Sequence, residues 1–235
     1  LLAIIKEFIE SAEAVGSVNL VNKYRLDVSS ATIRNEMAEL MKQGYIQKPH
    51  SSAGRVPTLQ AYKRFVNSLM EDLQELENYE VAPATLIKQQ IYASRFDIDE
   101  MIYTALNSLY DMTGNVSMAL VGNRVYHTGL ARVPTQPEFR QVQELCKLIN
   151  VLEDRILLKD LFSLQPKNNN VRVLFGDDTD IDVFKKMVII YSPVSFYNDR
   201  EGFIGVIGSV RMDYSKALPA VDFIANTINE IVSSW

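Results

Sequence analysis

The chain has 235 residues, of which 47% are hydrophobic and 23% charged, the balance of an ordinary soluble globular protein with one or two domains. Its apolar runs, such as residues 187–191, are far shorter than the roughly 20 residues of a membrane-spanning helix, and Lys6 and Glu7 follow the apolar start too closely for a signal-peptide core. The formal net charge of −5 argues weakly against a nucleic-acid-binding protein, so the distribution of charge along the chain matters more.

Two helices are predicted at the beginning of the chain. Apolar residues at helical spacing predict the first over residues 2–12, and Gly16 is expected to end it. Ser17 is expected to cap the second helix, over residues 17–24, and residues 26–28 connect it to a third.

The third helix carries residue types that read bases in the DNA major groove. Ser29 or Ser30 is expected to cap it and Gly44 to end it, and its apolar stripe consists of Ile33, Met37, Leu40 and Met41. With that stripe facing the core, the residues of the first turn that face outward are Ala31, Thr32, Arg34 and Asn35.

A recognition helix presents its N-terminal residues to base edges, where Arg binds guanine and Asn binds adenine through two hydrogen bonds each. The helix N-terminus with its serines also suits a phosphate. The alternative that spacing leaves open is an ordinary capped surface helix.

A hairpin with a polar tip is predicted over residues 45–58, with Gly54 closing the loop. Thr58 is expected to cap a fourth helix that continues to about residue 76. Three helices followed by a hairpin are typical of the winged helix-turn-helix, whose wing lies along the DNA backbone or in the minor groove. The tip offers His50, Ser51 and Arg55 for such contacts, although a plain surface loop explains His50 equally well.

The charge distribution favours DNA binding by this first part. Residues 1–70 carry a net charge of +3, whereas residues 71–235 carry −8. No Asp or Glu lies between Glu39 and Glu71, a stretch that contains Lys42, Lys48, Arg55, Lys63 and Arg64. Phosphate contacts need positive charge without neighbouring carboxylates, although a merely solvated basic face has the same composition.

The second part is predicted to be an α+β domain. Pro83 breaks the helical pattern, so residues 1–80 form the first domain and residues 81–235 the second. The predicted helices span residues 96–109, 138–152 and 218–232, the last with Pro219 in its first turn. The predicted strands span residues 116–121, 124–130, 171–175, 188–191 and 203–210.

Nothing in the sequence predicts an enzyme, a cofactor or a metal site. The only two histidines are far apart, and neither a nucleophile motif nor a Gly-rich phosphate loop is present. The acidic residues 177–182 are interpreted as a solvated turn. The single cysteine, Cys146, cannot form an internal disulfide, is expected to be packed, and fits a reducing cytoplasmic setting.

A ligand-sensing second domain is the main alternative. Its pocket would be lined by glycines and aromatic residues near the C-terminal strands, namely Tyr191, Phe196, Tyr197, Gly202, Phe203, Gly205 and Gly208. We favour the interpretation that these aromatic residues fill the core.

Three blocks of the sequence resemble the HrcA family of heat-inducible transcription repressors. The first comprises SSATIRNEMAEL (29–40), Gly44, PHSSAGRVPT (49–58) and Tyr62. The second is GVIG (205–208) followed by RMDY (211–214), after Pro193 and Gly202; the third is Gly129 and Leu130 followed by QPEF (136–139).

The resemblance implies a dimeric repressor of chaperone operons that binds an inverted-repeat operator and is kept active by the chaperonin GroEL. It implies a winged helix, a GAF-like second domain and an inserted dimerisation segment. The residues that it implies for DNA contacts are Ser30, Thr32, Arg34 and Asn35 in the helix, with His50, Ser51 and Arg55 in the wing.

The sequence departs from the family pattern in two places. Val18 stands where family members commonly carry a basic residue, which removes one phosphate contact. The chain is also short before Phe96 and between about residues 121 and 125, so the inserted dimerisation segment is expected to be shortened or missing.

Overall fold

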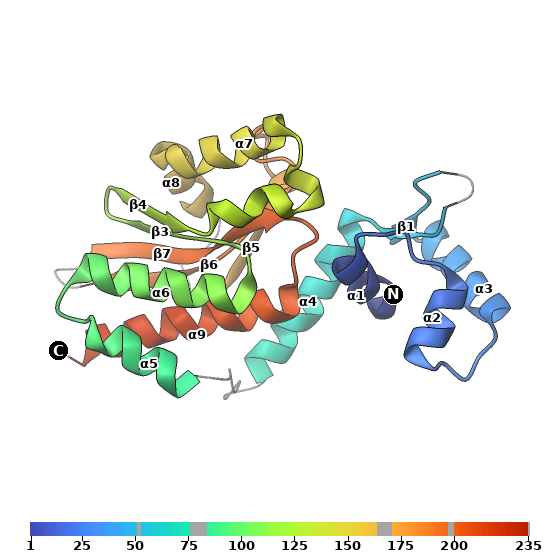
Figure 1. The fold of residues 1–235 in the computed structure, drawn as a ribbon, viewed down its shortest axis with the longest axis horizontal. Helices are drawn as coiled ribbons and strands as arrows, with labels where there is room; N and C mark the ends of the chain where they lie inside the picture. Colours follow the sequence, from blue (N-terminus) through green and yellow to red (C-terminus); the bar gives the residue numbers. More distant parts are fainter. Residues whose placement is uncertain (51–52, 76–83, 164–170, 197–199, 235) are drawn as a thin grey trace. The chain divides into compact units, whose positions relative to one another are not determined.

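The computed structural model describes residues 1–50, 53–75, 84–163, 171–196 and 200–234. The chain divides into two compact units, Leu1–Glu75 and Leu76–Trp235, which we call unit 1 and unit 2. Helices and antiparallel sheet occur in both, so the protein is of the α+β class, as predicted (Figure 1). No helix of the described residues is long and apolar enough to span a membrane.

Unit 1 consists of three helices, a short hairpin and a fourth helix. In chain order these are α1 (Leu2–Ser11), α2 (Ser17–Tyr24), α3 (Ser30–Lys42), β1 (Ile46–Gln47), β2 (Val56–Pro57) and α4 (Leu59–Glu75). Its core joins α1, α2, α3 and the hairpin through Ile4, Val15, Leu20, Met37 and Ile46. Ile33 and Leu40 pack against that core, whereas Met41, predicted in the same stripe, is 37% exposed.

Two predicted helix boundaries are wrong. The first helix ends at Ser11 rather than near Gly16, because Ala12 takes the left-handed conformation (φ 56°) and its N–H bonds to the carbonyl of Phe8. Gly16 instead precedes α2 as its N-cap, so Ser17 is the first helical residue and caps nothing with its side chain.

Unit 2 is built on a five-stranded antiparallel sheet in the order β4-β3-β7-β6-β5. The strands are β3 (Val116–Val121), β4 (Arg124–Thr128), β5 (Arg172–Phe175), β6 (Met187–Phe196) and β7 (Arg200–Ser209). All five predicted strands therefore exist. Val121 pairs with Arg124, so only Gly122 and Asn123 connect β3 to β4, at the place where the inserted segment was expected to be short.

Helices cover both faces of this sheet (Figure 1). They are α5 (Ala84–Ala93), α6 (Ile98–Thr113), α7 (Val142–Glu153), α8 (Arg155–Ser163) and α9 (Tyr214–Ser233), with short 3₁₀ turns at Leu130–Thr135, Pro137–Phe139 and Gly176–Asp178. α6 and α9 lie on one face, and α7 and α8 on the other. The sequence predicted neither α5 nor α8, and α9 begins at Tyr214, so Pro219 lies beyond its first turn.

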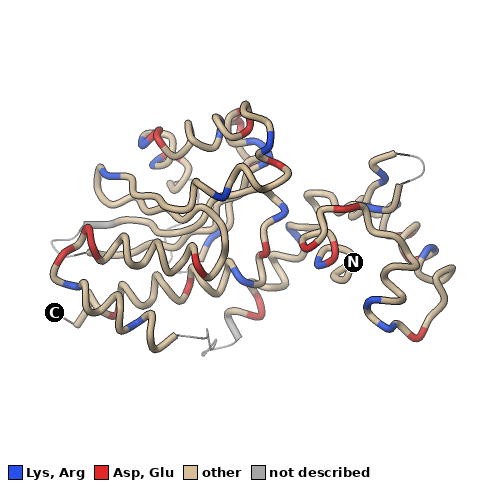
Figure 2. Tube along the Cα trace, viewed as in Figure 1, with Lys and Arg blue, Asp and Glu red and all other residues tan. Residues whose placement is uncertain are grey.

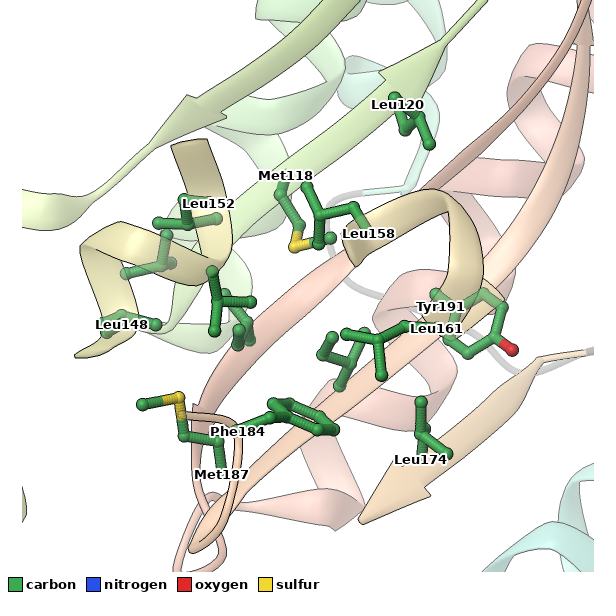
Figure 3. Packing of buried hydrophobic residues seen from close by; sticks show 14 of the residues in the cluster. Met118, Leu120, Leu148, Leu152, Leu158, Leu161, Leu174, Phe184, Met187 and Tyr191 are labelled. Atoms are coloured by element: carbon green, nitrogen blue, oxygen red, sulfur yellow. The ribbon is translucent and has the colours of Figure 1, made fainter. Parts of the chain in front are cut away.

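One hydrophobic core of unit 2 lies between the sheet and α7 and α8 (Figure 3). Phe162 of α8 contacts the rings of Tyr191 and Phe203, with centroid distances of 4.6 and 4.7 Å. Tyr191 is fully buried, and Phe196 is buried as well. This packing favours the core-filling interpretation of the aromatic residues over a ligand pocket; Tyr197 lies outside the described residues.

The glycines of that alternative pocket have packing roles instead. A Cβ atom on Gly205 would overlap the carbonyl oxygen of Ile190 on β6, and one on Gly202 would lie 2.7 Å from that of Leu120 on β3. A Cβ atom on Gly208 would lie 3.0 Å from the side-chain oxygen of Asn115. The expectation for Cys146 is wrong, because its side chain is exposed on α7.

Candidate nucleic-acid interface

The N-terminus of α3 is capped by Ser29. Its Oγ accepts a hydrogen bond from the N–H of Thr32 at 3.0 Å and lies 2.9 Å from the hydroxyl of Thr32. The first turn of α3 carries no acidic residue. Since the helix dipole is positive at this end, the turn favours a negatively charged group.

The side chains of the predicted base-reading turn point to solvent. Thr32, Arg34 and Asn35 are exposed, and Ser30 is half-buried. Ile33 packs against the core of unit 1 and Met37 is buried within it, which fixes the rotation of the helix. The exposed face of α3 therefore begins with a hydroxyl, a guanidinium and an amide.

The hairpin of unit 1 pairs Ile46 with Pro57 and Gln47 with Val56. Of the predicted wing residues, Lys48 and His50 are exposed and Arg55 is half-buried, while Ser51 lies outside the described residues. The guanidinium of Arg55 donates to the carbonyl of Ala53 at 3.5 Å.

A third extended segment, which sequence analysis missed, supports this hairpin. The N–H of Val15 donates to the carbonyl of Arg55, and the N–H of Arg55 to that of Val15, both at 2.8 Å. Gly54 makes the approach possible, since a Cβ there would lie 2.6 Å from the carbonyl oxygen of Val15. The one feature of the sequence that pointed to this pairing was Gly54 itself.

Thr58 ties the base of the hairpin to the end of α3 and the start of α4. Its hydroxyl donates to the carbonyl of Gly44 at 2.7 Å, and its N–H donates to the carbonyl of Tyr45 at 3.0 Å. The N–H of Ala61 in α4 donates weakly to the same hydroxyl at 3.4 Å, as the predicted cap requires. The hairpin and α3 therefore share one anchoring residue.

Some basic residues of unit 1 form ion pairs with carboxylates, which makes them less available to bind a phosphate. Lys23 binds the carboxylates of Glu10 and Glu7, each at 2.6 Å, and hydrogen bonds from the ammonium to these two groups raise the pKa of Lys23. Lys42 pairs with Glu39 at 3.4 Å. Figure 2 shows the charged positions along the described chain. The sequence has no acidic residue between Glu39 and Glu71.

Arg34 and Lys48 differ from these paired residues. Within the part of the chain that the structure describes, neither forms a hydrogen bond or an ion pair with another side chain. Their charges are exposed and uncompensated, which suits an anionic polymer. The described residues also contain no group of three His, Cys, Asp or Glu side chains that could hold a metal ion.

The close approach at Gly54 yields a testable prediction. We expect Gly54→Ala to destabilise unit 1 by about 1–3 kcal/mol, because the methyl group overlaps backbone that cannot move aside. Thermal unfolding followed by circular dichroism measures the loss. Gly16→Ala is the matched control, since a Cβ at Gly16 meets nothing within 4 Å. Equal stability of the two variants would contradict the proposed packing role.

Comparison with known proteins gives matches along most of the chain. A family model described as the HrcA protein C terminal domain matches residues 32–218. A heat-inducible transcription repressor HrcA from Pelotomaculum thermopropionicum is 24% identical over 332 residues, covering 99% of this chain and 94% of the relative. Proteins with the same description from Carboxydothermus hydrogenoformans and Roseiflexus castenholzii are 24% and 26% identical, covering 100% and 97% of this chain and 96% and 91% of the relatives.

A solved structure shares the fold. A crystal structure described as that of a hypothetical protein superposes with a TM-score of 0.78 at 15% identity, covering 99% of this chain and 96% of the other. The alignment with the Pelotomaculum relative extends over 332 residues, whereas this chain has 235. The relative therefore contains segments with no counterpart in this chain.

Proposed function

The chain belongs to the HrcA family of heat-inducible transcription repressors, and from this premise we propose that it represses chaperone operons by binding an inverted-repeat operator as a homodimer. The observation that carries the proposal is the N-terminus of α3, a capped turn that presents Arg34 and Asn35 to solvent without a competing carboxylate.

In this proposal, unit 1 is a winged helix-turn-helix domain and α3 is its recognition helix. The arrangement of three helices, a paired hairpin and a supporting extended segment at Val15 supports it. A recognition helix places its first turn against base edges while a wing contacts the backbone nearby. The shared anchor at Thr58 fixes the distance between these two elements, as simultaneous contact with one DNA duplex requires.

The side chains divide into two roles. Arg34 and Asn35 read bases, because guanidinium and amide groups can each form two hydrogen bonds to a purine edge. The remaining residues bind phosphates or the minor groove, namely Ser29, Ser30 and Thr32 at the helix N-terminus and Lys48, His50, Ser51 and Arg55 in the wing.

Unit 2 is a GAF-like regulatory and dimerisation domain in this proposal. Family membership further supports activity in the cytoplasm that is maintained by the GroEL chaperonin, so that unfolded proteins which occupy GroEL relieve repression. No catalytic activity and no cofactor are part of the mechanism.

A DNA titration tests the proposal. Fluorescence anisotropy compares the affinity for a chaperone-operon inverted repeat with that for a single half-site. A dimer that contacts both half-sites should bind the full repeat at least about 100-fold more tightly, because the second contact is intramolecular. Equal affinity for both DNAs would reject the dimeric repressor.

The same titration with purified GroEL tests the chaperonin. We expect GroEL to increase the fraction of protein that binds the repeat, and an added unfolded protein to reverse the increase. A binding-competent fraction that does not change with GroEL would remove the chaperonin from the proposal and leave operator binding intact.

A further inference from the structure

A carboxylate lies on the exposed surface of α3, one turn beyond the residues proposed to read bases. Glu39 follows Asn35 by four positions, so the two side chains are neighbours on the helix surface, and both are exposed. Ile33 and Met37 are the positions of the same helix that pack into unit 1. A carboxylate beside the base-reading turn repels the phosphates of bound DNA, so its position is unfavourable for affinity alone.

Two donors near the end of α3 hold this carboxylate. Its Oε1 accepts a hydrogen bond from the side-chain amide of Gln43 at 3.2 Å, and its Oε2 accepts one from the ammonium of Lys42 at 3.4 Å. The hydrogen bond from Gln43 and then that from Lys42 lower the pKa of Glu39, so the carboxylate stays charged at neutral pH. The ion pair with Lys42 is too exposed to contribute much to folding. Its larger effect is on the charge that the helix presents.

The ammonium that Glu39 neutralises lies on the same stripe of the helix as Asn35. Lys42 follows Asn35 by seven positions, which is two turns, or about 10 Å, along the helix axis. The side chain of Lys42 is 78% exposed. The first turn of α3 therefore carries an uncompensated cation, Arg34, whereas the cation of the last turn is compensated by Glu39.

The last turn of a recognition helix matters differently for the two kinds of DNA complex. At an operator the helix enters the major groove with its first turn, and base contacts fix that orientation. On other sequences no base contact fixes the helix, and the attraction of basic side chains to phosphates supplies the affinity. An uncompensated lysine in the last turn would therefore strengthen the second kind of complex more than the first.

We propose that Glu39 is a positioning residue that sets DNA specificity by holding Lys42 away from phosphates. It thereby weakens binding to DNA in general more than binding to the operator. The inference rests on the proposed function, because it takes α3 as the recognition helix. Discrimination between partners depends on disfavoured complexes as well as on favourable contacts, and the Glu39–Lys42 pair disfavours the sequence-independent complex.

Glu39→Gln in the full chain tests the inference, because glutamine keeps the size of the side chain and removes its charge. Fluorescence anisotropy compares the inverted repeat with scrambled DNA of the same length between about 50 and 200 mM salt. We expect the affinity for scrambled DNA to rise about tenfold at the lower salt, and its salt slope to steepen by about 1, because one phosphate contact is gained. Affinity for the inverted repeat should change less than about threefold, so the preference for the operator falls.

Glu36→Gln is the matched control for net charge. Glu36 is exposed on the same helix but forms no hydrogen bond or ion pair with another side chain among the described residues. Its replacement removes one negative charge without releasing a lysine, so scrambled DNA should gain at most about twofold. Thermal unfolding of both variants should match that of the wild type, because both side chains are exposed.

A double variant shows whether Glu39 acts through Lys42. Lys42→Gln alone should leave DNA binding nearly unchanged, because the ammonium is already paired. Combined with Glu39→Gln, it should reduce the gain on scrambled DNA to that of the Glu36→Gln control. A gain that persists in full without Lys42 would overturn the inference.

The remaining outcomes separate this inference from the proposed function. A Glu39→Gln variant that loses affinity for the inverted repeat alone would show that Glu39 accepts a hydrogen bond from a base, as carboxylates do from cytosine, and would overturn the inference. An equal gain on both DNAs would overturn it too. A wild-type chain that prefers the inverted repeat, with a Glu39→Gln variant that behaves identically, rejects only the inference. A wild-type chain with no preference for the inverted repeat rejects the proposed function, whatever the variant does.

Discussion

Replacing Arg34 with alanine is expected to weaken binding to the inverted repeat by about 1–3 kcal/mol per half-site, while binding to scrambled DNA changes little. The guanidinium is exposed on the first turn of α3, next to Asn35. An arginine that binds one guanine through two hydrogen bonds contributes mainly to discrimination between sequences. Both half-sites lose the contact, so the loss of operator affinity is twice that for one half-site. Fluorescence anisotropy with the two DNAs measures it.

Lys48→Ala is the comparison that separates base reading from charge. Lys48 is also exposed and without an ion pair among the described residues, but it lies after β1 rather than on α3. A phosphate contact contributes equally to all sequences, so Lys48→Ala should weaken binding to both DNAs and reduce the salt slope by about 1. If Arg34→Ala weakens both DNAs by the same factor, Arg34 binds phosphate and does not read bases.

Phe162→Ala is expected to destabilise unit 2 by about 3–5 kcal/mol. The ring is 1% exposed and contacts Tyr191 and Phe203, so truncation leaves a cavity that the surrounding strands cannot fill. For a unit of this size the loss lowers the melting temperature by roughly 10 °C. Differential scanning calorimetry of the full chain measures the shift in the transition of unit 2.

Ile156→Ala on the same helix is the control for this prediction. Its side chain is 67% exposed, so the change should lie within about 0.5 kcal/mol. A small effect of Phe162→Ala would instead indicate that the aromatic cluster tolerates empty space, as the wall of a ligand pocket does. That result would support the alternative in which unit 2 binds a small-molecule ligand.

Local patterns were sufficient for most elements near the candidate site. A serine at 29 or 30 before a helical stripe predicted the cap of α3, which is Ser29, and the polar stretch closed by Gly54 predicted the hairpin. Caps, turns and apolar periodicity depend on residues within a few positions of one another, so they can be read along the chain. Helix ends were less accurate, because the left-handed conformation of Ala12 ends α1 at a residue that has no special preference for it.

Contacts between segments far apart in the sequence could not be predicted from these local patterns. The pairing of Val15 with Arg55 is a single bridge, too short to produce an alternating pattern in the sequence. The blocks QPEF (136–139) and RMDY (211–214) gave no sign of meeting, yet Arg211 and Glu138 form an ion pair through two pairs of atoms.

The sequence by itself determined where the chain is basic and free of carboxylates, and that a serine at 29 or 30 caps the next helix, since charge distribution and capping are local properties. It also determined the family, through long motifs. Only the tertiary structure decided that Arg34 is exposed and uncompensated and that Cys146 is not packed. Exposure depends on which distant elements cover a residue, and that coverage is settled when the chain packs.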